Sequence, residues 1–115
     1  MTITRHEPGA ILSQAVEHGD TVYLAGIVAK DLKKDVKGQT EEVLAEIDRL
    51  LARAGSHKSK VLQATIWVTD IRNRAPMNEV WSKWADAKNL PGRARIEAKL
   101  ADPAALVEIM LIASK

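Results

Sequence analysis

The chemistry that this sequence offers centres on one arginine and one glutamate in its last third. Glu108 is the only ionisable residue in the apolar run Val107–Ile112. A lone carboxylate in an apolar strand is destabilising unless it is paired, hydrogen-bonded or protonated. Arg93, near the start of the preceding predicted strand, is the candidate partner. We therefore expect either a structural salt bridge, or a site where Arg93 binds a ligand carboxylate and Glu108 positions a water molecule.

The neighbours of Arg93 also suggest a binding site. Pro91 and Gly92 directly precede it and predict a turn, which places the arginine at the mouth of a sheet. Asn78 flanks the apolar stripe of a predicted helix and is a further candidate. The alternative is that Asn78 is simply an exposed residue on the surface of that helix, with no role in binding.

No other motif with a defined chemistry is found. The three histidines, His6, His18 and His57, show neither metal-ligand spacing nor a nearby group of carboxylates. The serines lack the context of a nucleophile elbow, and the glycines do not form a phosphate-binding loop. The sequence therefore predicts no metal site, no cofactor, and neither a serine hydrolase nor a nucleotide-binding protein.

The elements that must position these residues begin with a hairpin and a helix. Two β-prone runs, Ile11–Glu17 and Thr21–Gly26, are separated by the turn cluster His18–Asp20. A single apolar stripe at helical spacing follows over Val36–Ala54, and Gly55 is placed to end that helix. We expect two strands and then one helix.

The second half of the chain predicts three strands and one more helix. Apolar and polar residues alternate over Val61–Thr69, which is typical of a half-buried strand. In the next helix the apolar stripe is expected in the core rather than against a cofactor. It consists of Met77, Val80, Trp81 and Trp84. The last two strands are expected at Arg93–Lys99 and Leu106–Ile112.

This order, ββαβαββ, predicts an α+β fold in which a sheet of mostly antiparallel strands carries two helices on one face. Two helices cannot cover both faces of such a sheet, and residues such as Trp67 make the second face apolar as well. We therefore expect the chain to self-associate, most simply as a closed symmetric ring.

The composition fits one compact domain over residues 1–115. Apolar residues make up 46% of the chain and the net charge is only +2. The absence of cysteine and of an apolar leader or span predicts a cytoplasmic protein that is not inserted in a membrane. The one dense basic stretch, Lys30 to Lys37, also contains two aspartates and is expected to be a solvated loop. Nucleic acid is therefore not an expected partner.

The chain resembles the RidA/YjgF family, in its YoaB-like branch, over nearly its whole length. The order and spacing of several short segments carry this resemblance. They are Ser13-Gln-Ala-Val with Gly19, Tyr23-Leu-Ala-Gly26, Gln39-Thr with Ile47-Asp48, Ala54-Gly-Ser, Ala64-Thr-Ile-Trp-Val-Thr-Asp70, Met77-Asn78, and Pro91-Gly-Arg93 followed by Val107-Glu108-Ile.

The resemblance implies a chorismate-mutase-like homotrimer with a central barrel and three clefts between subunits. It also implies that Arg93 holds a substrate carboxylate and that Glu108 positions or activates a water molecule, with Gly26 and Asn78 near the cleft. Family members of this kind are imine deaminases that hydrolyse enamines and imines, such as 2-aminoacrylate, 2-iminopropanoate and 2-iminobutanoate. Their products are a 2-keto acid and ammonia.

Three positions depart from the pattern of the best-known deaminases. Leu12 stands where they have a tyrosine, Ala25 where they have a serine, and Arg95 where they have a cysteine. The cleft would thereby lose two hydroxyl groups and gain a second cation. A larger or doubly anionic ligand would suit that balance, unless Arg95 pairs with Glu97, Glu79 or another subunit.

Three functions follow as hypotheses. The first is an enamine/imine deaminase that acts on small carboxylate-bearing imines. The second is a non-catalytic module that binds a small carboxylate metabolite in the same cleft. The third, an endoribonuclease that inhibits translation, fits less well, because the chain lacks a histidine pair, has few aromatic residues and has a sparse basic surface.

Overall fold

The structure is a computed structural model that describes residues 1–115. It contains six strands and two α-helices in the order β1, β2, β3, α1, β4, α2, β5, β6. The strands are β1 (Ile3–Pro8), β2 (Ser13–His18), β3 (Thr21–Leu24), β4 (Val61–Val68), β5 (Gly92–Glu97) and β6 (Val107–Ser114). The helices are α1 (Val36–Arg53) and α2 (Arg74–Trp84), with short 3-10 turns at Lys58–Lys60 and Ile71–Asn73.

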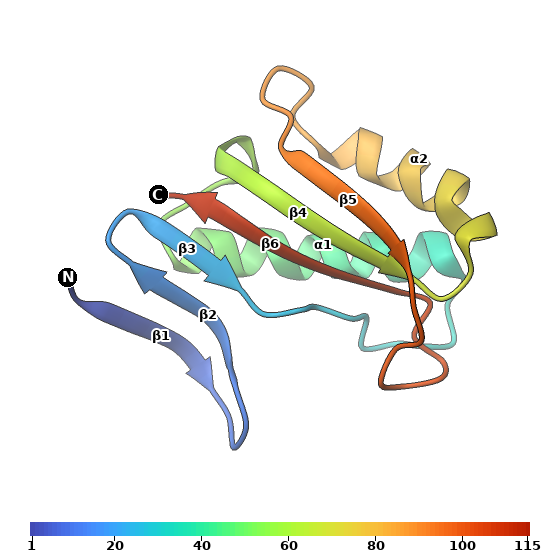
Figure 1. The fold of residues 1–115 in the computed structure, drawn as a ribbon, viewed down its shortest axis with the longest axis horizontal. Helices are drawn as coiled ribbons and strands as arrows, with labels where there is room; N and C mark the ends of the chain where they lie inside the picture. The colour runs from blue at the N-terminus through green and yellow to red at the C-terminus, as the bar shows by residue number, and fades with distance from the viewer.

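All six strands form one sheet in the order β1-β2-β3-β6-β4-β5. Every neighbouring pair is antiparallel except β4 and β5, which are parallel because α2 carries the chain back between them. Both helices lie on the same side of the sheet, behind it in the view of Figure 1. The predicted α+β fold, with two helices on one face, is confirmed.

The core lies between the helices and the sheet. The predicted stripe of α1 is buried throughout, including Val43, Ile47 and Leu50 at 0% exposure, against the inward-facing residues of β4 and β6. Gly55 has a φ of 78°, and the amides of Gly55 and Ser56 donate to carbonyls of the last helical turn. This left-handed residue ends α1 as the sequence predicts.

A buried glutamine of α1 fixes the start of β6. The Gln39 Nε2 donates to the carbonyls of Lys34 and Ala104 at 3.0 and 3.1 Å, and its Oε1 accepts from the Leu106 amide at 2.8 Å. The side chain is completely buried. Because Glu108 follows Leu106 by two residues, this glutamine helps to position the candidate glutamate.

The N-terminal strands differ from the prediction. β1 was not predicted, because it is polar and mostly exposed and therefore has no hydrophobic pattern. The strand is held instead by its backbone pairing with β2, by the hydrogen bond between His6 and Glu17, and by the ion pair of Glu7 with Arg49. The predicted strand at Ile11–Glu17 also begins later, at Ser13, because the two preceding residues belong to the hairpin turn.

The face of the sheet away from the helices is uncovered and partly apolar. Register and burial place Tyr23, Trp67, Ile96, Met110 and Ile112 on it together with Glu108. Tyr23 and Ile96 are more than 40% exposed in the single chain. The expected self-association would cover this face, and the trimer with a central barrel stays a prediction. No helix of the structure is long and apolar enough to cross a membrane.

Candidate functional site

Arg93 lies near the start of β5, at the edge of the sheet beside α2. Its Nη1 donates to the Oδ1 of Asn78 at 2.8 Å, and its guanidinium carbon lies 5.3 Å from the centre of the Trp81 ring. No carboxylate lies within 4 Å of it. The asparagine and the ring thus orient the guanidinium while leaving its charge free for an anion.

A hollow of about 500 Å³ opens beside this arginine. Asn78 and Trp81 form one side of it, and Leu90 and Pro91, from the segment that leads into β5, form another. The predicted turn at Pro91 and Gly92 is not formed, because the turn lies earlier, at Ala87 and Lys88, and Gly92 is already the first residue of β5. Arg93 nevertheless lines the hollow. Partial burial and the positive charge of Arg95 both lower the pKa of Arg93 from its usual value, in that order of importance.

Glu108 lies on β6 against a glycine of the segment that follows β3. A side chain on Gly26 would place its Cβ only 2.2 Å from Oε2 of Glu108, so the carboxylate occupies the space that the missing side chain leaves. Ile27 and Ile109 hold the two segments together through reciprocal backbone hydrogen bonds of 2.9 and 3.1 Å. The carboxylate of Glu108 forms no ion pair in the single chain.

Arg93 and Glu108 lie on opposite faces of the sheet. Arg93 is in register with Ala64, which points into the core beneath the helices. Glu108 is in register with Trp67, three residues further along the same strand. Side chains alternate along a strand, so these positions face opposite ways. The salt bridge that the sequence analysis considered is therefore not formed within one chain.

The structure thus divides the predicted site residues into two groups. The first group, Arg93, Asn78 and Arg95, lies on the side of the sheet that carries α2. The second group comprises Glu108 and Gly26, with Ala25 adjacent in the chain; the Ala25 amide donates to the Gln14 carbonyl at 2.9 Å. Leu12 joins neither group in the structure. It lies in the turn between β1 and β2 with its side chain half exposed.

Trp81 was predicted only as a core residue. It is indeed 5% exposed, but its ring also lies against the Arg93 guanidinium. The signal for this second role is its spacing of three residues from Asn78, which puts both side chains on one face of α2. The other predicted core tryptophan, Trp84, is only partly buried and donates from Nε1 to Asp48 at 3.0 Å.

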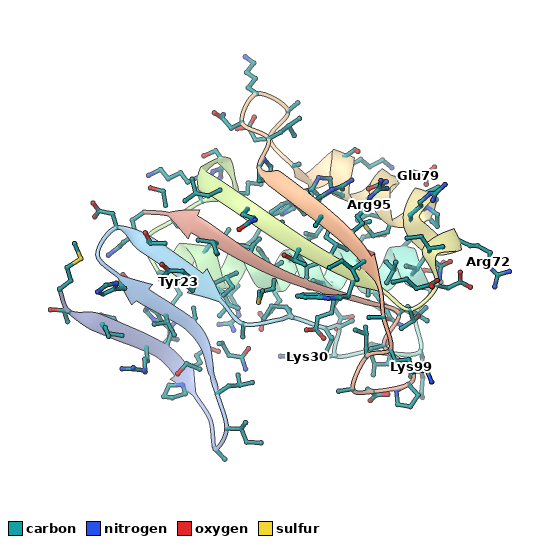
Figure 2. The ribbon with its side chains drawn as sticks, viewed as in Figure 1. Tyr23, Lys30, Arg72, Glu79, Arg95 and Lys99 are labelled. Atoms are coloured by element: carbon teal, nitrogen blue, oxygen red, sulfur yellow. The ribbon has the colours of Figure 1, made fainter.

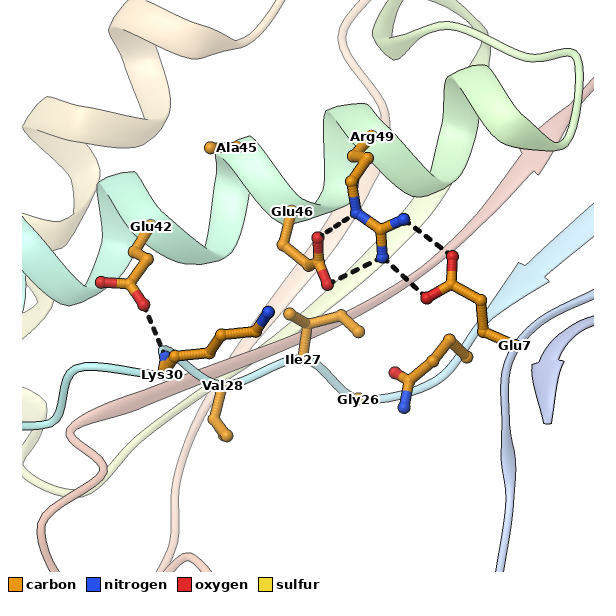
Figure 3. A pocket seen from close by; sticks show the side chains of 10 residues that line it. Glu7, Gly26, Ile27, Val28, Lys30, Glu42, Ala45, Glu46 and Arg49 are labelled. Atoms are coloured by element: carbon orange, nitrogen blue, oxygen red, sulfur yellow. Dashed lines mark hydrogen bonds and ion pairs between the residues drawn. The ribbon is translucent and has the colours of Figure 1, made fainter. Parts of the chain in front are cut away.

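A larger hollow of about 660 Å³ lies between α1 and the segment after β3, and it includes Gly26 (Figure 3). Its arginine is already neutralised. Arg49 binds both carboxylate oxygens of Glu7, at 2.7 and 2.9 Å, and also contacts Glu46. Three glutamates, Glu7, Glu42 and Glu46, line this hollow against two cations, Arg49 and Lys30. Despite its size, the hollow is therefore less suited to an anionic ligand than the cavity beside Arg93. No group of three His, Cys, Asp or Glu side chains is placed to hold a metal ion.

Comparisons with known proteins agree with this geometry. Solved structures of the YjgF family share this fold. A YjgF protein of Neisseria meningitidis superposes with a TM-score of 0.97 and 40% identity, covering 100% of this chain and 96% of that one. A structure from Pseudomonas aeruginosa gives a TM-score of 0.96 at 36% identity, covering 99% of each chain.

Sequence relatives define the family. The sequence model described as Endoribonuclease L-PSP matches residues 2–115. A RutC family protein of Haemophilus influenzae is 44% identical over 115 residues, and the RutC family protein YoaB of Escherichia coli is 40% identical over 114 residues. Each alignment covers 99% of both chains. The chain therefore belongs to the RidA/YjgF family, whose members are also called RutC family proteins.

Proposed function

We propose that this protein hydrolyses small enamines and imines that carry a carboxylate, of the 2-aminoacrylate type, to a 2-keto acid and ammonia. The observation that carries the proposal is the uncompensated guanidinium of Arg93. Asn78 and Trp81 hold it at a cavity of about 500 Å³, and no protein carboxylate neutralises it. A small carboxylate is the ligand that such a planar, oriented cation binds best.

Glu108 supplies the second requirement, a group that handles protons. Its carboxylate is free of an ion pair and fills the space over Gly26. In the proposed reaction it accepts a proton from water as the water oxygen attacks the imine carbon. Return of this proton to the nitrogen gives a carbinolamine. Glu108 then moves the hydroxyl proton to the nitrogen as the carbon–nitrogen bond breaks, which releases ammonia and a 2-keto acid. An enamine first takes a proton on carbon to become the imine.

Two chains must contribute to such a site. Arg93 and Glu108 face opposite ways in one chain, two strands apart in the sheet. The arginine of one subunit can meet the glutamate of another when the uncovered face of the sheet associates in a closed ring. A homotrimer with clefts between subunits, the assembly expected from the family resemblance, would bring the two residues together in this way.

The proposal is tested by release of ammonia from imines made in place. Purified protein is added to an amino-acid oxidase or a threonine dehydratase, beside the variants Arg93→Ala and Arg5→Ala. Loss of a bidentate charge-assisted contact of about 3 kcal/mol lowers kcat/KM about 100-fold. Arg5→Ala, which removes an exposed arginine of the opposite edge strand, keeps the parental rate.

Two outcomes would contradict the proposal. Equal rates for the parent and Arg93→Ala would show that the arginine does not anchor the substrate. Binding of small carboxylates without acceleration of any imine would instead favour the non-catalytic binding module. Ribonuclease activity is measured in the same preparations, and its survival in Arg93→Ala would separate it from this site.

A further inference from the structure

A second arginine stands next to Arg93 on the same face of the sheet. Arg95 follows it by two residues on β5 and is in register with Ile66, which points into the core like Ala64, the partner of Arg93. Residues two apart on a strand are separated by about 6.6 Å between Cα atoms. Both arginines are accessible to solvent in the single chain, although Arg93 is partly covered by its neighbours. The α2 side of β5 therefore presents two guanidinium groups side by side.

Neither arginine is neutralised by the protein. Figure 2 shows Arg95 extending from β5 on the side where Glu79 of α2 lies. Glu79, however, is paired with Lys37, and the carboxylate of Glu97 accepts the Ile71 amide at 2.8 Å. No carboxylate lies within 4 Å of Arg95. The pairings with Glu79 and Glu97 that the sequence left open are thus not formed in this chain.

Two neighbouring cations without counterions repel each other. The charge of Arg95 accordingly adds to partial burial in lowering the pKa of Arg93. A ligand with one negative charge would relieve this repulsion at one arginine only. A ligand with two carboxylates about one strand repeat apart would neutralise both.

We propose that Arg95 is a specificity residue that binds the second carboxylate of a dicarboxylic substrate, the 2-imino derivative of a four- or five-carbon dicarboxylic acid. The inference rests on the proposed role of Arg93 as the anchor of the first carboxylate. Arg95 does not take part in the hydrolysis. It selects among imines by adding one charge-assisted contact, so its effect falls on binding rather than on the chemical step.

The test compares the binding of two stable 2-keto acids, 2-oxoglutarate and 2-oxobutanoate, by titration calorimetry. The parent binds the dicarboxylate about tenfold or more tightly than the monocarboxylate, as one extra charge-assisted contact implies. Arg95→Gln removes this preference and leaves the affinity for 2-oxobutanoate within about twofold of the parental value. Arg95→Lys keeps part of the preference for the dicarboxylate. Arg5→Gln removes the same charge at the opposite edge of the sheet and changes neither affinity.

A kinetic readout separates selection from catalysis. With an amino-acid oxidase that generates the imine of glutamate, Arg95→Gln raises KM about tenfold and leaves kcat nearly unchanged. Arg93→Ala, by contrast, weakens the binding of both keto acids. The two proposals therefore fail in different ways. Unchanged binding of both keto acids by Arg93→Ala contradicts the role of Arg93 in binding the first carboxylate. An unaltered ratio of the two keto-acid affinities in Arg95→Gln contradicts the role of Arg95 in binding the second.

Three results would overturn the role of Arg95. They are equal affinities of the parent for the two keto acids, an equal loss of both affinities in Arg95→Gln, and dissociation of Arg95→Gln into smaller species by light scattering. The last would make Arg95 a contact between subunits rather than a ligand residue. Failure of the parent to bind either keto acid would overturn both proposals.

Discussion

At the scale of single residues, the contact between Gly26 and Glu108 makes the sharpest prediction. A Cβ at position 26 would meet the Glu108 carboxylate at 2.2 Å, so Gly26→Ala forces the proposed proton-transfer group to move. We expect kcat to fall on the order of 10- to 100-fold, because small displacements of a reacting group are costly. Binding of a keto acid at Arg93 is expected to change little.

Gly9→Ala is the matched control, because a Cβ there meets only the Leu12 carbonyl at an ordinary 3.7 Å. Full kcat in Gly26→Ala, with the carboxylate displaced in a crystal structure of the variant, would contradict the role of Glu108.

The sequence indicated the two important residues but not their relation. Glu108 was recognised because it is the only charge in an apolar strand, and Arg93 because it is the candidate partner of that carboxylate near the start of the preceding strand. Which face of the sheet each one occupies depends on the register of β4 with both β5 and β6. That register forms between segments distant in the chain, and a one-residue shift would exchange the faces. Their separation could therefore not be predicted.

At the scale of elements, Gln39 is expected to tie α1 to the start of β6. Gln39→Leu would leave the Leu106 amide and the carbonyls of Lys34 and Ala104 without their partner. We expect a loss of about 1–3 kcal/mol in the free energy of unfolding, the range for an unsatisfied buried polar group. Urea unfolding measures it. Glu41→Leu introduces the same side chain at an exposed site of α1, and an equal loss there would refute this account.

The stability of the folded chain is expected to depend on pH through Glu17 of β2, which links β1 to the C-terminal residue Lys115. Hydrogen bonds from Lys115 and His6, with Lys115 the larger cause, lower the pKa of Glu17 below its ordinary value of 4.5. A lowered pKa in the folded state stabilises the protein above pH 4.5, and the stabilisation is lost as the pH falls through the lowered pKa.

We therefore expect Glu17→Gln to be less stable than the parent at neutral pH, by on the order of 1 kcal/mol or less. This difference should shrink as the pH falls below 4.5. Thermal unfolding across this pH range measures it, with Glu41→Gln as the control. A difference that stays constant down to acid pH would show that the carboxylate charge contributes nothing.

Most elements were predictable because they bury a periodic apolar face. The stripe of α1 matches a buried surface in the structure, and so does the alternation of β4 from Ala64 to Val68. Leu62, predicted on the same face, is 55% exposed because the register shifts between Val61 and Gln63. β1 could not be found in this way, since its stability comes from backbone pairing and from ion pairs such as Glu7 with Arg49. The parallel pairing of β4 with β5 was also missed, because it follows from the path of α2 rather than from either strand alone.

At the scale of the whole molecule, the central claim is that each site combines Arg93 of one subunit with Glu108 of another. Neither Arg93→Ala nor Glu108→Gln alone is then expected to be active. Mixed rings of the two variants, however, contain some sites in which both residues are intact. If the chains assort at random in equal amounts, about a quarter of the sites in a closed ring regain both groups.

The most direct measurement is therefore imine hydrolysis by co-refolded Arg93→Ala and Glu108→Gln chains. The account predicts about a quarter of the parental activity in the mixture, where each variant refolded alone is nearly inactive. As a control, chains that carry both substitutions are refolded with the parent. This mixture shows how much activity remains when intact chains are mixed with inactive ones. Persistent inactivity of the mixture, with mixed assemblies demonstrated by native mass spectrometry, would contradict a site shared between subunits.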